Sequence, residues 1–276
     1  MDSMPGYDVH FTSSEEMSEL AEESVQTIVT SPPYYQEKNY GSHETNLENR
    51  ESYEEYKEGL KSVLEECFRV LKPDGKLCLN LMDPYTTVDN HDRFQRLPLT
   101  QETTLFLEEL GLDYMETVRW CKKRFGNSGT VFGSYPHPTN LYFAGSYENL
   151  LIFRKWVGEE YYSTRELPDK EVKEASKVTK EEWREWTDPT WQFDGVDTND
   201  DHPAKFPYEL PYRCIRMFSF QGDTVLDPFC GSGTALKAAV DTGRKAVGYE
   251  VEEKYKDTIE EKLTQTTLSQ HSTTES

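Results

Sequence analysis

The sequence predicts an α/β protein built on one mainly parallel, doubly wound sheet. Short apolar runs rich in β-branched residues, typical of buried strands, alternate with segments whose apolar residues recur at helical spacing. Near the C-terminal end, one such strand runs into a glycine-rich turn and the start of a helix, a connection that suits a parallel sheet. With 276 residues, the chain is long enough for one large domain of this class and a smaller insertion.

The first predicted elements surround a pair of prolines. Val25–Thr30 (VQTIVT) has the composition of a buried strand, and Ser31-Pro32-Pro33 ends it because proline restricts the backbone to extended conformations. Residues 36–50 are polar and rich in turn formers, which predicts a surface loop able to close over a ligand. Residues 52–71 carry apolar side chains on one helical face, so we expect a helix that Pro73-Asp74-Gly75 ends.

Strands and helices continue to alternate towards the C-terminus. Residues 223–227 (DTVLD) and 245–250 (KAVGYE) flank a predicted helix, which makes a second strand-helix-strand unit. The further expected strands are at residues 76–82, 112–120 and 149–153. The expected helices are at residues 100–110, 208–218, 235–242 and 252–263.

The regular alternation breaks between residues 156 and 201. This stretch mixes large aromatic residues with many charges and has little periodicity, which predicts an inserted segment. Residues 1–155 and 202–263 then form the main domain. Residues 264–276 are rich in Thr, Ser and Gln, and we expect them to be a disordered tail.

The chain is strongly acidic, with 51 acidic and 30 basic residues and a formal net charge of −21. This balance argues against a generic basic nucleic-acid binder, because phosphate contacts come from Lys and Arg. A dense carboxylate surface is instead compatible with a very salty cytoplasm, where long-range repulsion is screened to about 3 Å at 1 M salt.

Cysteine usage and hydropathy exclude several protein classes. The five cysteines contain no CxxC pair, so we expect buried thiols and neither a disulfide framework nor a metal site. No run approaches the roughly 18 apolar residues of a membrane helix, and residues 1–20 are acidic rather than signal-like. The sequence therefore predicts a cytoplasmic protein with no membrane association.

A ligand site is predicted where residues 225–234 (VLDPFCGSGT) place a strand, a tight glycine turn and a helix start in succession. Such a turn lets a ligand approach backbone amides closely. Glu250 ends the next strand, 17 residues beyond Gly233, where an acidic side chain can accept hydrogen bonds from ribose hydroxyls. The turn lacks the Lys-Ser or Lys-Thr ending of a phosphate loop and is not GxGxxG, which disfavours a triphosphate.

Three motifs in one order resemble a known family. Residues 31–34 (SPPY) resemble the signature of amino-methyltransferases that act on DNA, residues 227–234 (DPFCGSGT) their cofactor motif, and residues 202–207 (HPAKFP) their remaining S-adenosylmethionine-binding motif. This order is that of the family's β group, and the resemblance covers residues 7–262. It implies a Rossmann-type S-adenosylmethionine-dependent methyltransferase fold in which residues 156–201 are a target-recognition insertion.

The resemblance also implies a reaction. An exocyclic base amine is a poor nucleophile because its lone pair is delocalised, so the site must hold it close to the methyl donor and accept its hydrogens. By resemblance, the Ser31 hydroxyl and the Pro32 carbonyl accept those hydrogens, Pro33 keeps the motif rigid, and Tyr34 stacks on a base flipped out of double-stranded DNA. No covalent nucleophile is required, and the chain has no Pro-Cys pair of the kind expected for C5 methylation of cytosine.

For the cofactor, the resemblance implies a pocket built mainly by the glycine turn, with Glu250 holding the ribose. The carried-over residues are Asp227, Pro228, Phe229, Gly231, Gly233 and Thr234 from the cofactor motif, and His202, Phe206 and Pro207 from the upstream motif. His202 has an alternative interpretation as a helix cap or surface residue. Relatives usually carry Gly-Asp before the catalytic motif, where this chain has Thr12-Ser13, which leaves the adenine contacts unassigned.

The target base follows from the first position of the catalytic motif. Ser, as at Ser31, is typical of the family's N4-cytosine enzymes, whereas Asp or Asn is commoner in N6-adenine enzymes. We therefore expect site-specific methylation of N4 of cytosine, with N6 of adenine as the alternative. A catalytically inactive DNA-binding paralogue is a second alternative, although the intact SPPY and glycine turn argue against it. Methylation of RNA or protein is disfavoured by the motif order.

DNA must contact a local basic face, because the chain as a whole is acidic. Lys122, Lys123 and Arg124 are the candidates, with a solvated surface as the alternative interpretation. The acidic composition together with the resemblance suggests a haloarchaeal enzyme that modifies CTAG. The sequence leaves open the recognition site itself, a homodimer, and a companion restriction enzyme.

Overall fold

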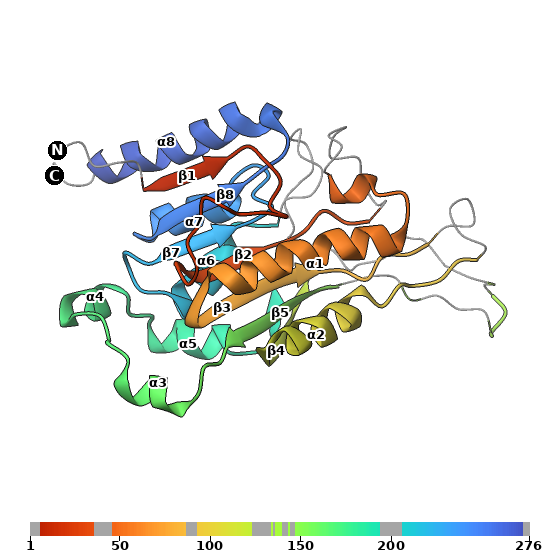
Figure 1. The fold of residues 1–276 in the computed structure, drawn as a ribbon, viewed down its shortest axis with the longest axis horizontal. Helices are drawn as coiled ribbons and strands as arrows, with labels where there is room; N and C mark the ends of the chain where they lie inside the picture. The colour runs from red at the N-terminus through yellow and green to blue at the C-terminus, as the bar shows by residue number, and fades with distance from the viewer. Residues whose placement is uncertain are drawn as a thin grey trace.

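The computed structural model describes residues 6–35, 46–86, 93–122, 134, 136–139, 143, 147–193 and 206–272. These residues form an eight-stranded sheet in the order β1-β8-β7-β2-β3-β5-β4-β6, with helices on both faces (Figure 1). Neighbouring strands pair in parallel except at β5, which is antiparallel to both β3 and β4. The predicted mainly parallel α/β fold is therefore confirmed.

The element boundaries follow the expected alternation closely. The strands are β1 Tyr7–His10, β2 Val25–Thr30, β3 Leu71–Leu81, β4 Leu112–Cys121, β5 Tyr147–Lys155, β6 Thr190–Gln192, β7 Thr224–Asp227 and β8 Lys245–Tyr249. The helices are α1 Tyr53–Val70, α2 Leu99–Leu110, α3 Glu159–Thr164, α4 Lys170–Ala175, α5 Lys180–Trp186, α6 Glu209–Phe218, α7 Thr234–Asp241 and α8 Lys256–Ser272. Two further 3-10 turns are Leu47–Asn49 and Glu253–Tyr255. The edge strands β1 and β6 were not predicted, because four and three residues are too few to show a period.

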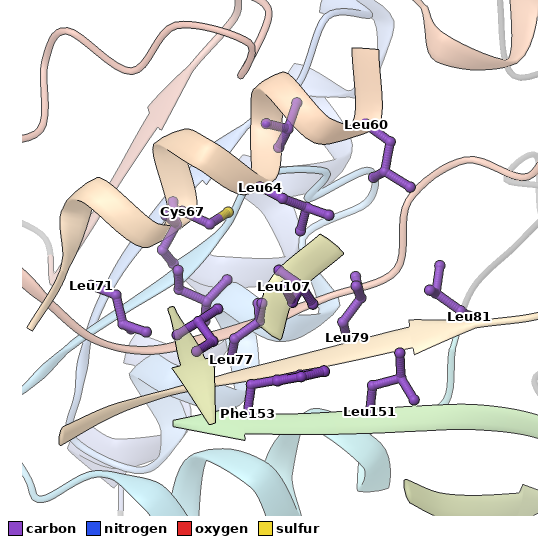
Figure 2. Packing of buried hydrophobic residues seen from close by; sticks show 14 of the residues in the cluster. Leu60, Leu64, Cys67, Leu71, Leu77, Leu79, Leu81, Leu107, Leu151 and Phe153 are labelled. Carbon is purple, nitrogen blue, oxygen red and sulfur yellow. The ribbon is translucent and has the colours of Figure 1, made fainter. Parts of the chain in front are cut away.

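The hydrophobic core has two halves, one on each face of the sheet. Helices α1 and α2 bury their apolar sides on one face, and α6, α7 and α8 bury theirs on the other. Figure 2 shows Leu60 and Leu64 of α1 above Leu79 of β3 and Phe153 of β5. Each such buried side chain contributes about 1.5–3 kcal/mol of transfer free energy. The sheet is thus clamped between two helical layers, which fixes the strand ends.

The junction between α1 and β3 departs from the prediction. The Ser52 hydroxyl caps α1 by accepting a hydrogen bond from the Glu55 amide at 3.2 Å, as its position before the apolar face suggests. The helix then passes directly into β3 at Leu71, so the turn expected at its end lies within the strand. The pairing register with β2 shifts there, and Asp74 has a φ of 60°, which locates the proline and glycine in an irregular part of the strand.

The structure describes residues 156–193 of the expected insertion, and hydrogen bonds tie this segment to the main domain. The Tyr161 hydroxyl donates to the Pro73 carbonyl at 3.2 Å, and the Gln221 amide donates to the Ser176 hydroxyl at 2.8 Å. Both partners precede or begin strands, so α3 and α4 lie at the amino edge of the parallel strands, at the left in Figure 1. Only β6 returns along the sheet, parallel to β4.

The aromatic residues of this segment divide between core and surface. Trp186 and Trp191 are buried, and the Trp191 indole donates to the Trp186 carbonyl at 3.2 Å. Trp183 is 63% exposed. These two tryptophans therefore belong to the buried core, whereas α3 and α4 lie away from the edge at which the two predicted motifs sit.

The C-terminal helix is longer than the sequence led us to expect. α8 runs over Lys256–Ser272, so the backbone is helical in the first part of the segment expected to be a disordered tail. That segment contains neither Pro nor Gly before residue 272, so nothing in it stops a helix. Among the described residues, no helix is long and apolar enough to cross a membrane.

Candidate active site

The two predicted motifs begin at the ends of neighbouring strands. β2 and β7 pair in parallel, and their last residues are Thr30 and Asp227. The Thr30 hydroxyl donates a hydrogen bond to the Asp227 carboxyl group at 2.6 Å, and both side chains are buried. The loops that follow therefore leave the sheet side by side at its carboxyl edge, where open α/β sheets bind ligands.

Both loops line one open cavity. The SPP segment forms one wall and the glycine turn another, while the loop after β1 and the loop after β8 complete it. The lining residues used below are Thr12, Ser13, Ser31, Pro32, Pro33, Phe206, Pro228, Phe229, Gly231, Thr234 and Glu250. An electrophile bound at the turn and a nucleophile bound at the SPP loop would thus share one space.

The glycine turn is shaped by backbone geometry that disfavours a side chain. Gly231 and Gly233 have φ angles of 49° and 77°, in the left-handed region. The Gly233 amide donates to the Cys230 carbonyl at 2.7 Å, and the Cys230 amide donates to the Tyr249 carbonyl at 2.9 Å, which ties the turn to β8. α7 starts at Thr234, directly after the turn. The turn therefore presents backbone amides and a helix start to the cavity.

Two carboxyl groups support the cavity floor. Burial raises the pKa of Asp227 to about 7. Hydrogen bonds from the Thr30 hydroxyl and the Phe229 amide act in the opposite direction and lower this pKa, but burial has the larger effect. Burial also raises the pKa of Glu250, while amides of Glu252 and Gly231 that donate to it favour its charged form. Glu250 lines the cavity at the end of β8, whereas Asp227 lies below it and is 1% exposed. Of these two groups, Glu250 is therefore the one within reach of a ligand.

A polar cluster lies on the catalytic side of the cavity. The Tyr34 hydroxyl donates to the Glu148 carboxylate at 2.7 Å, and the Asn80 amide donates to the same Oε2 atom at 2.5 Å. Ser31 Oγ lies 3.5 Å from the Tyr34 hydroxyl and 3.4 Å from Asn80 Nδ2. Lys122 Nζ lies 2.5 Å from Glu148 Oε1. These side chains come from β3 and β5 or from the residues that follow β2 and β4, so the sheet itself assembles the cluster.

Asn80 and Glu148 were not predicted as site residues. Both are polar side chains next to apolar runs of their strands, and in the structure they are 1% and 5% exposed. Polar groups are buried at a cost unless they have hydrogen-bond partners, so a lone Asn or Glu in such a strand is itself a signal. Nothing in the sequence tells which distant residues provide those partners.

One of the three residues expected to contact DNA, Lys122, lies within the described part of the chain. Lys122 was a candidate for DNA binding, but its ammonium group forms an ion pair with Glu148, whose side chain is nearly buried. Lys123 and Arg124 lie outside the described residues.

The upstream cofactor motif is described in part. Phe206 lines the cavity. The Pro207 carbonyl accepts a hydrogen bond from the Leu210 amide at 3.1 Å, so Pro207 stands at the start of α6 rather than among the lining residues. His202 lies outside the described residues. Thr12 and Ser13, which replace the usual Gly-Asp, do line the cavity.

The cavity fits a nucleoside linked to an amino acid. It offers an acceptor carboxylate at Glu250, an aromatic side chain at Phe229, hydroxyl groups at Thr12 and Ser13, and the amides of the glycine turn. These groups match ribose hydroxyls, a purine face, purine edge atoms and a charged amino-acid end. Among the described residues, no three His, Cys, Asp or Glu side chains cluster so that they could hold a metal ion.

Comparison with known proteins gives a consistent picture. A family model described as DNA methylase matches residues 25–261. The chain is 33% identical to the Type II methyltransferase M.MthZI of Methanothermobacter thermautotrophicus, over 94% of this chain and 76% of that protein. It is 34% identical to the Type II methyltransferase M.MjaI of Methanocaldococcus jannaschii, over 95% and 93%. The crystal structure of TTHA0409 of Thermus thermophilus with S-adenosyl-L-methionine superposes with a TM-score of 0.73 at 30% identity, covering 94% of each chain.

Proposed function

Since the chain belongs to the DNA methylase family and is an S-adenosylmethionine-dependent DNA methyltransferase, we propose that it methylates the exocyclic N4 of cytosine in double-stranded DNA. The observation that carries the proposal is Ser31, which leads the SPPY motif and lines the same cavity as the glycine turn. Serine at this position is typical of the N4-cytosine enzymes of the family.

The chain's own groups have separate tasks in this reaction. S-adenosylmethionine supplies an electrophilic methyl group on a sulfonium ion. In this proposal Glu250 holds its ribose, and Phe229 and the backbone at Gly231 shape the methionine side of the pocket, which is supported by all three residues lining the cavity. Ser31 Oγ and the Pro32 carbonyl accept the amine hydrogens, which orients the nitrogen lone pair towards the methyl group. The target base must leave the duplex to reach this position, which costs a few kcal/mol.

Tyr34 supports the flipped base through its ring. Its hydroxyl group is held by Glu148 at 2.7 Å, so the ring has little freedom left to lose when a base stacks on it. The preceding Pro32 and Pro33 limit the backbone in the same way. We propose that this rigidity offsets part of the cost of flipping.

DNA is proposed to approach the carboxyl edge of the sheet. β4 ends at this edge at Cys121 and β5 starts from it at Tyr147, as their antiparallel register places these two residues opposite each other. Lys122 follows β4 at this edge, and we propose that it contacts DNA phosphates together with Lys123 and Arg124, the next residues in the sequence. The helices α3 and α4 lie at the opposite edge, and we assign them no contact with the flipped base.

The proposal is tested by identifying the product. Double-stranded DNA is incubated with the protein and S-adenosylmethionine, digested to nucleosides, and analysed by mass spectrometry. N4-methylcytosine is the expected product. N6-methyladenine without N4-methylcytosine would overturn the choice of base while leaving the enzyme a DNA methyltransferase.

Two narrower predictions from the sequence remain predictions. A CTAG target is tested by sequencing methylated DNA at base resolution, and methylation confined to other sequences contradicts it. Adaptation to high salt is tested by assaying activity and stability from dilute buffer to molar salt. Full activity and stability in dilute buffer contradict that adaptation, because the repulsion within a chain of net charge −21 is then tolerated without screening.

A further inference from the structure

The hydroxyl groups of the SPPY motif lead to a carboxylate that no motif contains. From Ser31 Oγ the next hydroxyl, that of Tyr34, is 3.5 Å away, and from there Glu148 Oε2 is 2.7 Å away. Tyr34 is 6% exposed and Glu148 is 5% exposed, so this chain of polar atoms runs into the interior of the protein. A Glu at this depth is rare unless other groups compensate for its burial.

Two neighbours compensate for that burial and hold the carboxylate in place. Asn80 Nδ2 donates to Glu148 Oε2 at 2.5 Å, and Lys122 Nζ lies 2.5 Å from Glu148 Oε1. Asn80 Nδ2 also lies within 3.4 Å of both Ser31 Oγ and the Tyr34 hydroxyl. The Asn80 amide therefore contacts all three polar groups, Ser31, Tyr34 and Glu148. Its own Oδ1 is buried and has no hydrogen-bond partner among the described residues. Buried acceptors normally have a partner, so a water or an incoming amine is expected there.

We propose that Glu148 is a positioning residue for methyl transfer and the end of a proton path that starts at the target amine and passes through Ser31 and Tyr34. The inference rests on the proposed function, because it takes an exocyclic base amine as the nucleophile. It applies equally to cytosine and to adenine, since both amines must lose one proton.

Electrons and protons balance along this path. The amine nitrogen forms the new N–C bond with its lone pair while the C–S bond breaks and its electron pair stays on sulfur. The methylated nitrogen then carries a positive charge and gives one proton to Ser31 Oγ. Ser31 passes its own proton to the Tyr34 oxygen, and Tyr34 passes its proton to Glu148 Oε2. Glu148 ends neutral and returns the proton to solvent on the side of Lys122, whose side chain is 41% exposed.

The ion pair with Lys122 gives the path its direction. The charged and titratable groups that face Glu148 among the described residues are the Lys122 ammonium from the end of β4 and the Tyr34 phenol after β2. Lys122 Nζ contacts Oε1, the other carboxylate oxygen from the one that Tyr34 and Asn80 contact, so the Lys122 side chain marks where the proton leaves for solvent.

The first test separates the ring of Tyr34 from its hydroxyl group. Tyr34→Phe keeps an aromatic face for the base but removes the link to Glu148. We expect the single-turnover rate of methyl transfer at saturating cofactor and DNA to fall about 10- to 100-fold, with the DNA dissociation constant unchanged. Tyr162→Phe is the matched control, because its hydroxyl also bonds a carboxylate, Asp74 at 3.0 Å, but at the opposite edge of the sheet. A rate for Tyr34→Phe equal to that of the control would overturn the proposal.

The second test uses the pH dependence of Glu148 variants. We expect the wild-type single-turnover rate to fall at acidic pH, because a protonated Glu148 cannot accept a further proton. Glu148→Gln should be about 100-fold slower and lose this acidic fall, while Glu148→Asp should recover part of the rate and restore the fall. Thermal stabilisation by S-adenosylmethionine checks that each variant is folded. A slow Glu148→Gln variant that keeps the wild-type pH profile would contradict the proton path and leave only a structural role.

The two proposals fail in distinguishable ways. The wild-type product identifies the methylated base, whereas the ratio of variant to wild-type rates tests the path. N6-methyladenine from the wild type together with a slow, pH-independent Glu148→Gln variant would overturn the choice of cytosine and support the role of Glu148.

Discussion

The cofactor side and the catalytic side of the cavity are built in different ways. The central part of the cofactor side is local in sequence: the glycine turn and Glu250 lie between β7 and the end of β8, and most of the shape of the turn is backbone conformation. The catalytic side is distributed: Ser31, Tyr34, Asn80 and Glu148 come from segments up to 117 residues apart in the sequence and meet through side chains.

This difference separates two kinds of preorganisation. A turn fixed by positive φ angles holds its amides in place whether or not distant residues are correct. A cluster of hydroxyl, amide and carboxylate groups holds its geometry only if every partner is present, because each unsatisfied buried group costs about 1–3 kcal/mol. Substitutions on the cofactor side should therefore change affinity, and those on the catalytic side should change rate.

The largest expected effect is at Ser31. Ser31→Ala removes the hydroxyl that accepts an amine hydrogen, and we expect the single-turnover rate to fall about 100-fold or more. The dissociation constant for S-adenosylmethionine, measured by calorimetry, should stay within about twofold, because the carbonyl of Pro32 and the cavity wall remain. An unchanged rate would remove Ser31 from the reaction.

The next effect is a pH dependence of stability that comes from Asp227. Burial raises its pKa from an ordinary 3.8 to about 7, so between these values the folded protein holds a proton that the unfolded chain has released. By linkage, the free energy of unfolding falls as the pH rises from about 4 to about 7. Asp227→Asn cannot ionise and should remove this component, which is on the order of a few kcal/mol. Urea unfolding across this pH range measures it, with the exposed Asp169→Asn variant as the control.

Substitution of Glu250 should change the affinity for the cofactor and not the rate of methyl transfer. Glu250→Gln replaces a charged acceptor by a neutral one, and we expect S-adenosylmethionine to bind about 10-fold more weakly. The rate at saturating cofactor should change little. The exposed neighbour Glu253→Gln serves as the control and should leave affinity unchanged. A loss of rate without a loss of affinity would contradict the division between the two sides.

The smallest expected effect is at Gly233. Gly233→Ala forces a residue with a side chain to a φ of 77°, at a cost of about 1–2 kcal/mol. The added methyl group would meet Ile259 at 3.4 Å, an ordinary contact, so strain rather than collision sets the cost. We expect a lower melting temperature and a few-fold loss of cofactor affinity. Gly222→Ala, at a φ of 87° in open space, should lower stability similarly without affecting the cofactor.

The same division sets how much the sequence could predict. The α/β alternation, the SPP loop after β2, and the glycine turn after β7 are readable because each depends on neighbouring residues, and parallel strands must end at one edge. Asn80 and Glu148 were missed because their role depends on partners from other strands. The ion pair of Lys122 was missed because the sequence shows its basic neighbours but not the carboxylate beside it in space. The placement of α3 and α4 was missed for the same reason, since contacts such as Tyr161 to Pro73 span 88 residues.

The bond between Thr30 and Asp227 has a consequence for how the donor and acceptor of the methyl group are spaced. Each partner is the last residue of its strand, so the loops for the base and for the cofactor depart from adjacent strands, about 4.8 Å apart as in any sheet. The distance between the base loop and the cofactor loop is thus set by the spacing of neighbouring strands, and no hinge between two domains is required to bring them together. Insertion of a single residue in either strand would rotate one loop to the other side of the sheet and separate the reactants, although every motif residue would still be present.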